Sequence, residues 1–437
     1  MNLEYALVGD MSWQTQADWQ TPDTPFMSFT FWQALSDTGA IGEKAGWLPI
    51  YIVVYDGDKH RPIAVMPVFV KGHHQGEFVF DYSWAQAYAH YGLDYYPRLV
   101  TSVPYTPITG QRLWLAANQG LTPEIIQTAI KGVDDVAQQV GASSWHCLFA
   151  ESQLATITAS SSQEIAAAID ESRIALAGAD DRQEQPPESA QTSKTSLPVF
   201  ERQGCQFLWQ NQNLLADAQP FTDFENFLAT LRAKKRKTIR AERRKVTEQN
   251  IVCARKCGSD ITDSDWKAFY HCYVMTYAVR GQQPYLTLDF FMALAQSMPE
   301  HLMLALAYDS DNEIIASSLF LYDSPNSEHS TLYGRYWGAL ADYNSLHFEL
   351  CYYQGIEFAI EQGLQYFDPG TQGEHKLVRG FIPTTTHSLH RIYDERFIPA
   401  ISNFCIEDRQ RMAQYRQQAH QALPFNADNM PVFDSEQ

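Results

Sequence analysis

The chain has 437 residues, of which 45% are hydrophobic and 13% aromatic, so it is long enough for two domains and its composition excludes wholesale disorder. Its formal net charge of −19 disfavours general coating of nucleic acid, because repeated phosphate contacts need a broad basic surface. Any polyanion would have to meet one local patch.

The sequence carries no signal for a membrane span or for secretion. No window approaches the roughly 18 uncharged apolar residues of a transmembrane helix. The first residues, MNLEYALVGDMSW, lack the basic and apolar regions of a signal peptide. The seven Cys form no CxxC pair and no H-E-x-x-H motif occurs, so we expect reduced thiols and no metal site. These features together predict a cytoplasmic protein.

The first part of the chain alternates strand-like and helical runs. Two apolar runs, 47–55 and 62–70, flank DGDKHR and predict a β-hairpin, because Asp-Gly suits a tight turn. The other predicted elements are strands at 76–82, 110–116 and 144–150, a helical pattern around 87–100, and a helix from about Pro123 to Val140.

Residues 151–198 differ in composition from their surroundings. They are rich in Ser, Gln, Ala, Glu and Pro and poor in large apolar residues, so they cannot bury enough surface to offset their ordering entropy. We expect a disordered, low-complexity insertion between an N-terminal domain, 1–150, and a C-terminal domain, 199–437.

The C-terminal part repeats the earlier order. Its predicted elements are a strand at 205–211, a long helix from about Asp223, a strand at 251–255, helices at 266–279 and 288–298, strands at 302–308, 314–322 and 331–337, a helix at 345–363 and a strand at 364–368. YIVVYDGDKHRPIA aligns with MLALAYDSDNEIIA, with Tyr55 over Tyr308 and Asp56 over Asp309. A duplication explains this most economically, although a chance alignment of two hydrophobic hairpins stays open.

The order of these elements suggests a fold class. Helices, a three-stranded antiparallel meander, a helix and a parallel strand, in that order, resemble the core of the GNAT acyltransferases. Its repetition predicts an α/β chain with α+β mixed sheets and a tandem duplicated GNAT-like acyltransferase fold.

The densest polar cluster is FDPGTQGEHKLVRGFIPTTTHSLHRI, residues 367–392, directly after a predicted strand. Its glycines allow close backbone approach, so the segment could wrap a ligand. A long polar surface turn is the alternative interpretation. The candidate residues within it include His375, Lys376 and Arg379.

A second candidate segment runs from Arg335 to Leu340 and reads R-x-x-G-x-L. It is one residue short of the R/Q-x-x-G-x-G/A loop with which acetyltransferases hold the pyrophosphate of coenzyme A on backbone amides. His347 and Glu349 follow in the next predicted helix, about 200° apart around its axis, so they cannot both face one site. A structural role for His347 is as well supported as a ligand contact.

A third segment, from Arg232 to Lys245, holds nine Lys or Arg and one Glu in fourteen residues. Helical spacing places an apolar seam through Ile239 and Val246, with the basic side chains opposite. A solvated helix face is the simplest interpretation. The electrostatic cost of so much like charge would also be relieved by an anionic ligand or by the acidic remainder of the protein.

These motifs, together with GEFVFDYSWA and YYPRLVTSVPYTPITG in the first part, resemble the FemAB-like family of peptidoglycan biosynthesis or recognition proteins, within the GNAT superfamily. The resemblance covers nearly the whole chain except the insertion. It implies transfer of an acyl or aminoacyl group to an amine. In Fem-type enzymes the donor is an aminoacyl-tRNA and the acceptor a peptidoglycan precursor, and FDPGTQGEHKLVRGF resembles their Asp, Gly-rich turn and Lys pattern, with Lys376 at the lysine. The intervening segment is shorter here, which leaves acyl-coenzyme A as an alternative donor.

The resemblance and the chemistry of acyl transfer assign roles to these residues. Lys376 is expected to contact the oxyanion or the donor phosphate, and Glu349 to act as base. The expected contacts to substrate or donor are Arg335, Arg379, His347, His375, Arg236, Arg240 and Arg243. A non-catalytic module that binds a cell-wall precursor or nucleic acid through the 232–245 helix is the competing hypothesis.

Overall fold

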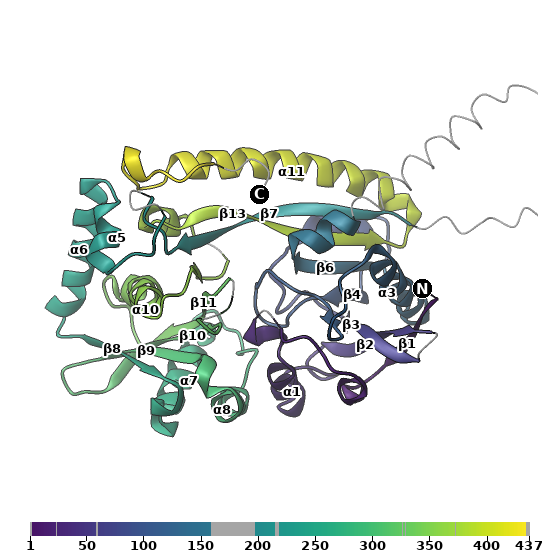
Figure 1. Ribbon diagram of the computed structural model, residues 1–437, viewed down its shortest axis with the longest axis horizontal. Coiled ribbons are helices and arrows are strands. Elements are labelled where there is room, and N and C mark those ends of the chain that lie inside the picture. Colours follow the sequence, from purple (N-terminus) through teal and green to yellow (C-terminus); the bar gives the residue numbers. More distant parts are fainter. Residues whose placement is uncertain are drawn as a thin grey trace, which may run out of the picture.

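The computed structural model describes the chain except residues 1, 23, 58–59, 159–196, 215–217, 326, 328, 372 and 434–437. Most of the predicted insertion therefore lies outside the described residues. The described part forms two halves that share one continuous mixed sheet (Figure 1).

The N-terminal half is an antiparallel meander followed by a helix and a parallel strand. Strands β1 (Leu3–Val8), β2 (Leu48–Asp56), β3 (Arg61–Lys71) and β4 (Arg98–Thr101) pair antiparallel in chain order, and the short β5 (Trp114–Leu115) pairs with β3. Helix α3 (Pro123–Val140) begins at the Thr122 cap and ends before Gly141, whose φ is +66°. Strand β6 (Ser144–Ala150) then pairs parallel with β4.

The C-terminal half repeats this topology. Strands β8 (Val252–Cys257), β9 (Leu302–Tyr308), β10 (Ile314–Tyr322) and β11 (Thr331–Ala339) form the antiparallel meander. A helical segment follows, and β12 (Tyr366–Asp368) pairs parallel with β11. The tandem GNAT-like architecture is therefore confirmed by the strand order of the chain itself.

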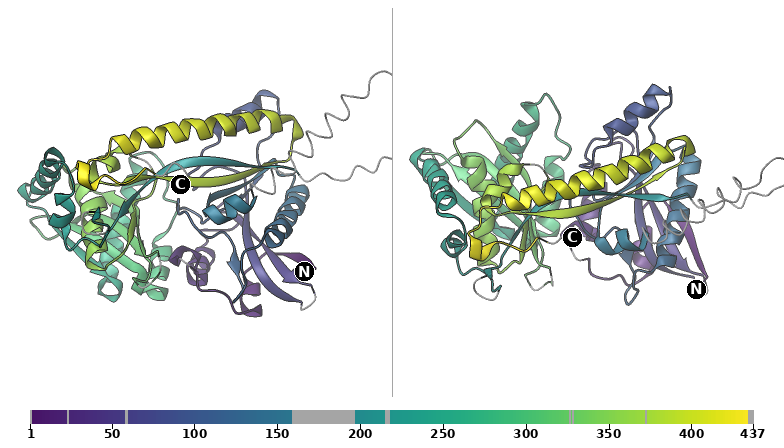
Figure 2. Two further views of the ribbon diagram at one scale, coloured as in Figure 1. Left: turned by 45° about the horizontal axis from the view of Figure 1, so that its top comes forward. Right: turned by 90° about the horizontal axis from the view of Figure 1, so that it is seen from above.

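Two long strands join the halves by exchange. Strand β7 (Val199–Gln210) follows the N-terminal half in sequence but pairs with β12, whereas β13 (Ile382–Ile392) follows the C-terminal half and pairs with β6. β7 and β13 also pair with each other over ten positions, from Ile382 with Leu208 to Arg391 with Val199. Helix α11 (Ile398–Gln421) lies along this pair and spans both halves (Figures 1 and 2).

Helix α7 (Asp263–Ala278) packs on β10 and β11, and α1 (Phe29–Asp37) packs against α8 (Leu288–Ser297). Further helices are α2 (Tyr82–His90), α5 (Phe224–Ala229) and α6 (Ala233–Glu248). Three sequence predictions are wrong here. Residues 76–81 form an irregular loop rather than a strand, and the long helix expected from Asp223 is divided into α5 and α6. The helical pattern expected around 87–100 ends with α2 at His90, and Arg98–Thr101 form β4.

One aromatic core is shared by the two halves, which fixes the halves relative to each other. Phe31 of α1 packs edge-on against Phe290 of α8, with ring centroids 5.7 Å apart. Phe26 packs in the same way against Tyr333 of β11 at 5.2 Å. These rings are almost fully buried, and such aromatic pairs contribute about 0.5–1.5 kcal/mol each beyond the area that they bury. A cavity between the halves therefore has walls held by a common core.

Candidate active site

The site begins where β11 and β12 separate. The two strands pair over only three positions, ending with Tyr333 and Asp368, and then diverge. The Arg335 side chain closes the base of this gap, because its Nη2 donates to the Asp368 carboxylate at 2.7 Å and its Nη1 to the Asp368 carbonyl at 3.1 Å. The Arg335 side chain is 2% exposed. It is a buried cation whose one carboxylate partner among the described residues is Asp368.

Lys376 reaches the same gap from the segment after β12. The chain turns at Gly370 and Gly373, with φ of +82° and +97°, and enters a short 3₁₀ helix, Glu374–Arg379. The Lys376 Nζ donates to the carbonyl oxygens of Gly370 at 2.6 Å and Thr371 at 3.2 Å. Burial lowers the pKa of Lys376 to about 8, with a smaller lowering from Arg335 and an opposing effect of Asp368.

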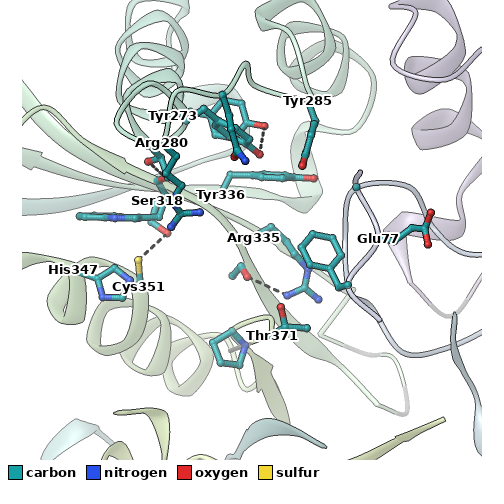
Figure 3. Close-up of a pocket in the computed structure, with 18 of the residues that line it drawn as sticks. Glu77, Tyr273, Arg280, Tyr285, Ser318, Arg335, Tyr336, His347, Cys351 and Thr371 are labelled. Carbon is teal, nitrogen blue, oxygen red and sulfur yellow. Dashed lines mark hydrogen bonds between the residues drawn. The ribbon is translucent and has the colours of Figure 1, made fainter. Parts of the chain in front are cut away.

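Arg335 and Lys376 line one cavity of about 630 Å³ between the two halves (Figure 3). Its walls come from four regions: the loop before α2, the end of α7 with its following loop, the meander strands, and the segment from His347 to Lys376. The lining residues of the second half include Arg280, Ser318, Tyr336, His347, Cys351, Tyr352, Thr371 and His375. Its size suits a cofactor-sized substrate.

A π-helical segment forms one wall of the cavity. Residues Glu349–Tyr353 adopt π geometry between the short helix α9 (Leu346–Phe348) and α10 (Gln354–Glu361). π segments are rare and often occur at functional sites. This segment aims Cys351 and Tyr352 at the cavity, where the Tyr352 hydroxyl and the His375 Nε2 form a hydrogen bond of 2.7 Å.

His347 and His375, which line the cavity beside Lys376, are both neutral near pH 7. Burial, with smaller effects of His375, Arg379 and Lys376, lowers the pKa of His347 to about 4. The pKa of His375 is also lowered, chiefly by burial and by Arg379. A neutral imidazole can accept a proton, so both are candidates for proton acceptors in the cavity.

Glu349, which the sequence suggests as a base, lies outside this cavity. Its side chain is 5% exposed and accepts two hydrogen bonds of 3.0 Å from Arg243. The Gln354 amide donates to it at 2.8 Å. The structure therefore separates Glu349 from His347, as their expected 200° spacing on a helix requires, and it is His347 that faces the cavity.

Arg379 is not a lining residue, although its Nη1 donates to the carbonyl of the lining residue His375 at 2.7 Å. Its guanidinium donates to the Tyr353 hydroxyl at 2.9 Å and to Glu242 at 2.7 Å. It also stacks over the Phe348 ring, 3.6 Å from the centroid. The side chain is 3% exposed, and it links the π segment to α6 within the protein interior.

The basic helix α6 is neutralised in part by acidic residues of the same fold. Arg240 pairs with Glu225 at the surface, and Arg243 pairs with both Glu349 and Glu357. Arg236 donates to the carbonyl of Leu231 at 2.5 Å. None of these three arginines is among the described residues that line the cavity. Acidic residues elsewhere in the protein thus reduce the repulsion among the basic side chains of α6, which is one of the two explanations that the sequence allowed.

The predicted pyrophosphate loop is wrong. Arg335 to Ala339 lie within strand β11, where Gly338 pairs with Ser317 of β10, so these positions form a strand rather than an anion-binding loop. A Cβ at Gly338 would overlap the backbone carbonyl of Cys272 in α7. The glycine is therefore needed for close packing of helix on strand.

Several cavity residues had no clear signal in the sequence. Arg280 is exposed, lies just beyond α7, and its side chain forms no hydrogen bond or ion pair with the described residues. The Tyr336 hydroxyl and the Arg335 Nε are buried without a hydrogen-bond partner in the described part of the chain. Such polar atoms beside a cavity are available to a ligand.

Two further features of the described residues concern metal binding and membrane insertion. In the described ranges no group of three or more His, Cys, Asp or Glu side chains is arranged to hold a metal ion. Among the helices that the structure describes, none combines the length and apolar character needed to cross a bilayer.

Comparison with known proteins identifies the family. The model of the FemAB-like family, described as peptidoglycan biosynthesis/recognition, matches residues 6–174 and 180–427, which confirms the resemblance seen in the motifs. No curated protein matches the sequence.

Solved structures with related topology share little sequence. L-PGS from Bacillus licheniformis is 10% identical, with 89% of this chain and 99% of that chain covered and a TM-score of 0.44. A conserved protein of unknown function from Bacteroides thetaiotaomicron is 11% identical, with coverage of 89% and 99% and a TM-score of 0.45. A tandem GNAT protein from the clavulanic acid biosynthesis pathway is 7% identical, with coverage of 90% and 98% and a TM-score of 0.39.

Proposed function

Because the chain belongs to the FemAB-like family of peptidoglycan biosynthesis or recognition, we propose that it transfers an acyl or aminoacyl group from a phosphate-bearing donor to an amine. The proposed donor is an acyl-coenzyme A or an aminoacyl-tRNA, and the proposed acceptor is a peptidoglycan precursor. One observation carries the proposal: Arg335 and Lys376, from two separate segments, meet at a single cavity between the halves.

The reaction requires a place for developing negative charge. The amine lone pair attacks the carbonyl carbon of the donor and forms the C–N bond, while the carbonyl π electrons move to oxygen. The Lys376 ammonium, buried and charged below its pKa of about 8, stabilises this oxyanion. The intermediate then collapses, and the C–S or C–O bond of the donor breaks with its electron pair on the leaving group.

The amine must also lose a proton. His347 and His375 are neutral imidazoles that line the cavity beside Lys376, and we assign the acceptor role to this pair in place of Glu349. Glu349 is committed to Arg243 and is left out of the proposed reaction. The proton then passes to the departing thiolate or alkoxide, so no other reagent is needed.

The donor phosphates need cationic contacts. Arg335 keeps one guanidinium nitrogen, Nε, without a hydrogen-bond partner in the described structure, and Arg280 is exposed at the same cavity. Arg280 can bind phosphate oxygens through two parallel hydrogen bonds, whereas Arg335 can add one donor, Nε. These two arginines are the proposed phosphate contacts, whereas Arg379, Arg236, Arg240 and Arg243 are not.

The test compares variants of the cavity with a variant of the basic helix. Acetyl-coenzyme A, longer acyl thioesters and charged tRNA would be offered as donors, with an amine-bearing peptidoglycan precursor as acceptor. Lys376→Met should lower the transfer rate about 10²- to 10³-fold while the protein stays folded. Arg240→Ala should transfer at the wild-type rate. Wild-type transfer by Lys376→Met would refute the proposed role, and failure of every donor would refute the proposed function.

A further inference from the structure

Two stacked aromatic rings stand at the edge of the cavity on the N-terminal half. The rings of Phe80 and Tyr82 are nearly parallel, at 9°, with centroids 5.4 Å apart. Phe80 is 45% exposed and Tyr82 49%, and both line the cavity. His74 packs edge-on against Tyr82 at 5.1 Å. We call Phe80 and Tyr82 the aromatic platform.

The residue between the two rings explains why they face outward. Asp81 is 4% exposed, and its carboxylate accepts hydrogen bonds from Arg98 and, at 2.5 Å, from the Tyr95 hydroxyl. Arg98 also pairs with Glu77, which lies four residues before Asp81 in the sequence. Because Asp81 is anchored inward, the side chains on either side of it point away from the core.

A further bond fixes the backbone of the aromatic platform. The Arg202 guanidinium donates to the Phe80 carbonyl at 3.1 Å. The loop is thus held by buried ions rather than by burial of its own rings. Large exposed apolar groups held in place by a buried polar network are typical of binding surfaces.

The charge around the aromatic platform favours an anionic ligand. Arg280, Arg335 and Lys376 line the same cavity, and Glu77 is the only carboxylate among its described lining residues. Glu77 is paired with Arg98, and Arg335 is paired with Asp368. Arg280 and Lys376, which form no ion pair with a described carboxylate, therefore make the cavity cationic within a chain whose net charge is −19.

We propose that the aromatic platform stacks the adenine ring of the donor while the cavity arginines and Lys376 contact its phosphates. This inference rests on the proposed function, because acyl-coenzyme A and aminoacyl-tRNA both carry an adenine nucleotide. Stacking on an aromatic face is available to any base and contributes on the order of 10-fold or more in affinity per base. A cationic patch beside the rings supplies the complementary contact for the attached phosphate.

The test measures how much the base adds to binding. Isothermal titration of the full chain would compare AMP with ribose 5-phosphate. The two compounds differ by the adenine base alone. The base-bearing probe should bind roughly 10-fold more tightly to the wild type. In the Phe80→Leu/Tyr82→Leu variant this ratio should fall close to 1, with little change for the base-free probe.

A matched control lies on the same half of the molecule. Tyr91, at the end of α2, is 71% exposed and does not line the cavity, so Tyr91→Leu should keep the wild-type ratio. A tRNA acceptor-stem mimic ending in adenosine would distinguish the two donor sources, because only the true donor should combine base dependence with transfer.

Three results would overturn the inference. They are equal binding of base-bearing and base-free probes by the wild type, an unchanged ratio in the double variant, and binding of vesicles containing anionic lipid that is lost in the double variant while AMP binding is not. In all three cases the effect of Lys376→Met on transfer still reports separately on the proposed function. If Lys376→Met loses transfer while Phe80→Leu/Tyr82→Leu keeps the wild-type ratio of base-bearing to base-free binding, the aromatic platform alone is rejected.

Discussion

Arg243 of α6 and Glu349 of the π-helical segment form a two-pronged ion pair, with both N···O distances at 3.0 Å. The same guanidinium donates to Glu357 at 2.5 and 3.2 Å. One arginine of the basic helix therefore pairs with two carboxylates, Glu349 of the π segment that forms a wall of the cavity and Glu357 of α10. The helix that stands out in the sequence as a possible anion site thus supports the wall of the candidate site.

This ion pair predicts a large difference between two arginines of the same helix. Arg243→Ala leaves the nearly buried Glu349 without its charged partner, so the free energy of unfolding should fall by about 3 kcal/mol. Arg240→Ala removes a surface pair whose side chains are 53% and 65% exposed, and should cost less than about 1 kcal/mol. Urea denaturation of the two variants measures the difference, and equal losses would show that the Arg243 pair contributes no more than a surface contact.

The pKa of Lys376 predicts an alkaline limit to activity. Because burial lowers this pKa to about 8, the ammonium is present below pH 8 and is lost as the pH rises through that value. Transfer that depends on the ammonium should therefore decline above about pH 8. Lys376→Arg keeps a charge to far higher pH, so any remaining activity should lose this decline.

The measurement is kcat/KM for transfer between pH 6 and pH 10. Lys245→Arg, a substitution of an exposed lysine in α6, serves as the control and should keep the wild-type profile. A Lys376→Arg profile with the same alkaline decline would mean that another group, such as the acceptor, sets the limit.

Much of the fold follows from the sequence because hydrophobic periodicity marks the meander strands and α3, and the two halves repeat one order. The exchange of β7 and β13 does not follow. Both strands carry ordinary strand patterns, and their choice of partner is decided by tertiary packing between segments far apart in the chain. The π segment could not be predicted from the sequence either, because a hydrophobic pattern with 3.6 residues per turn does not reveal one wider turn.

The site was predictable where chemistry and local turns coincide. Lys376 and Arg335 stood out because a glycine-rich segment and a polar strand end flank β12 and β11, and both residues line the cavity. The sequence predicts Glu349 as a base and Arg243 as a substrate or donor contact, because their mutual contact joins positions 106 residues apart, which no local pattern reports. The segment 76–82 was predicted to be a strand because aromatic residues alternate with other residues along it. The buried positions of the loop 76–81 include Glu77 and Asp81, which pair with Arg98.

Gly338 provides a test of the corrected strand assignment. In Gly338→Ala the added methyl group would overlap the Cys272 carbonyl, so α7 and β11 must separate, and the free energy of unfolding should fall by about 1–3 kcal/mol. Gly120→Ala is the matched control, because a Cβ at Gly120 meets no atom within 4 Å. Thermal denaturation measures both. Loss of coenzyme A binding without loss of stability in Gly338→Ala would instead restore the phosphate-loop hypothesis.

The two halves also meet at a buried histidine pair that predicts sensitivity to acid. His146 of β6 and His390 of β13 face each other across the exchanged strands, with their Nδ1 atoms 2.6 Å apart. Each is 1% exposed, and the other ring nitrogens bond to Ser144 at 2.7 Å and Ser388 at 2.9 Å. This arrangement accommodates two neutral rings, one donating and one accepting.

Burial, with Arg98 and Arg202 nearby, lowers the pKa of both histidines well below the ordinary value. In the unfolded chain they titrate near pH 6.5, so below that pH the unfolded state binds more protons than the folded state. The free energy of unfolding therefore falls with acidification, by up to about 1.4 kcal/mol per pH unit for each histidine, until the folded pKa is reached. Urea denaturation from pH 7.5 to pH 5 should show a shallower dependence in His146→Gln/His390→Gln, whereas the exposed His90→Gln should keep the wild-type slope. The same slope in the double variant would show that the pair is not what makes the junction sensitive to acid.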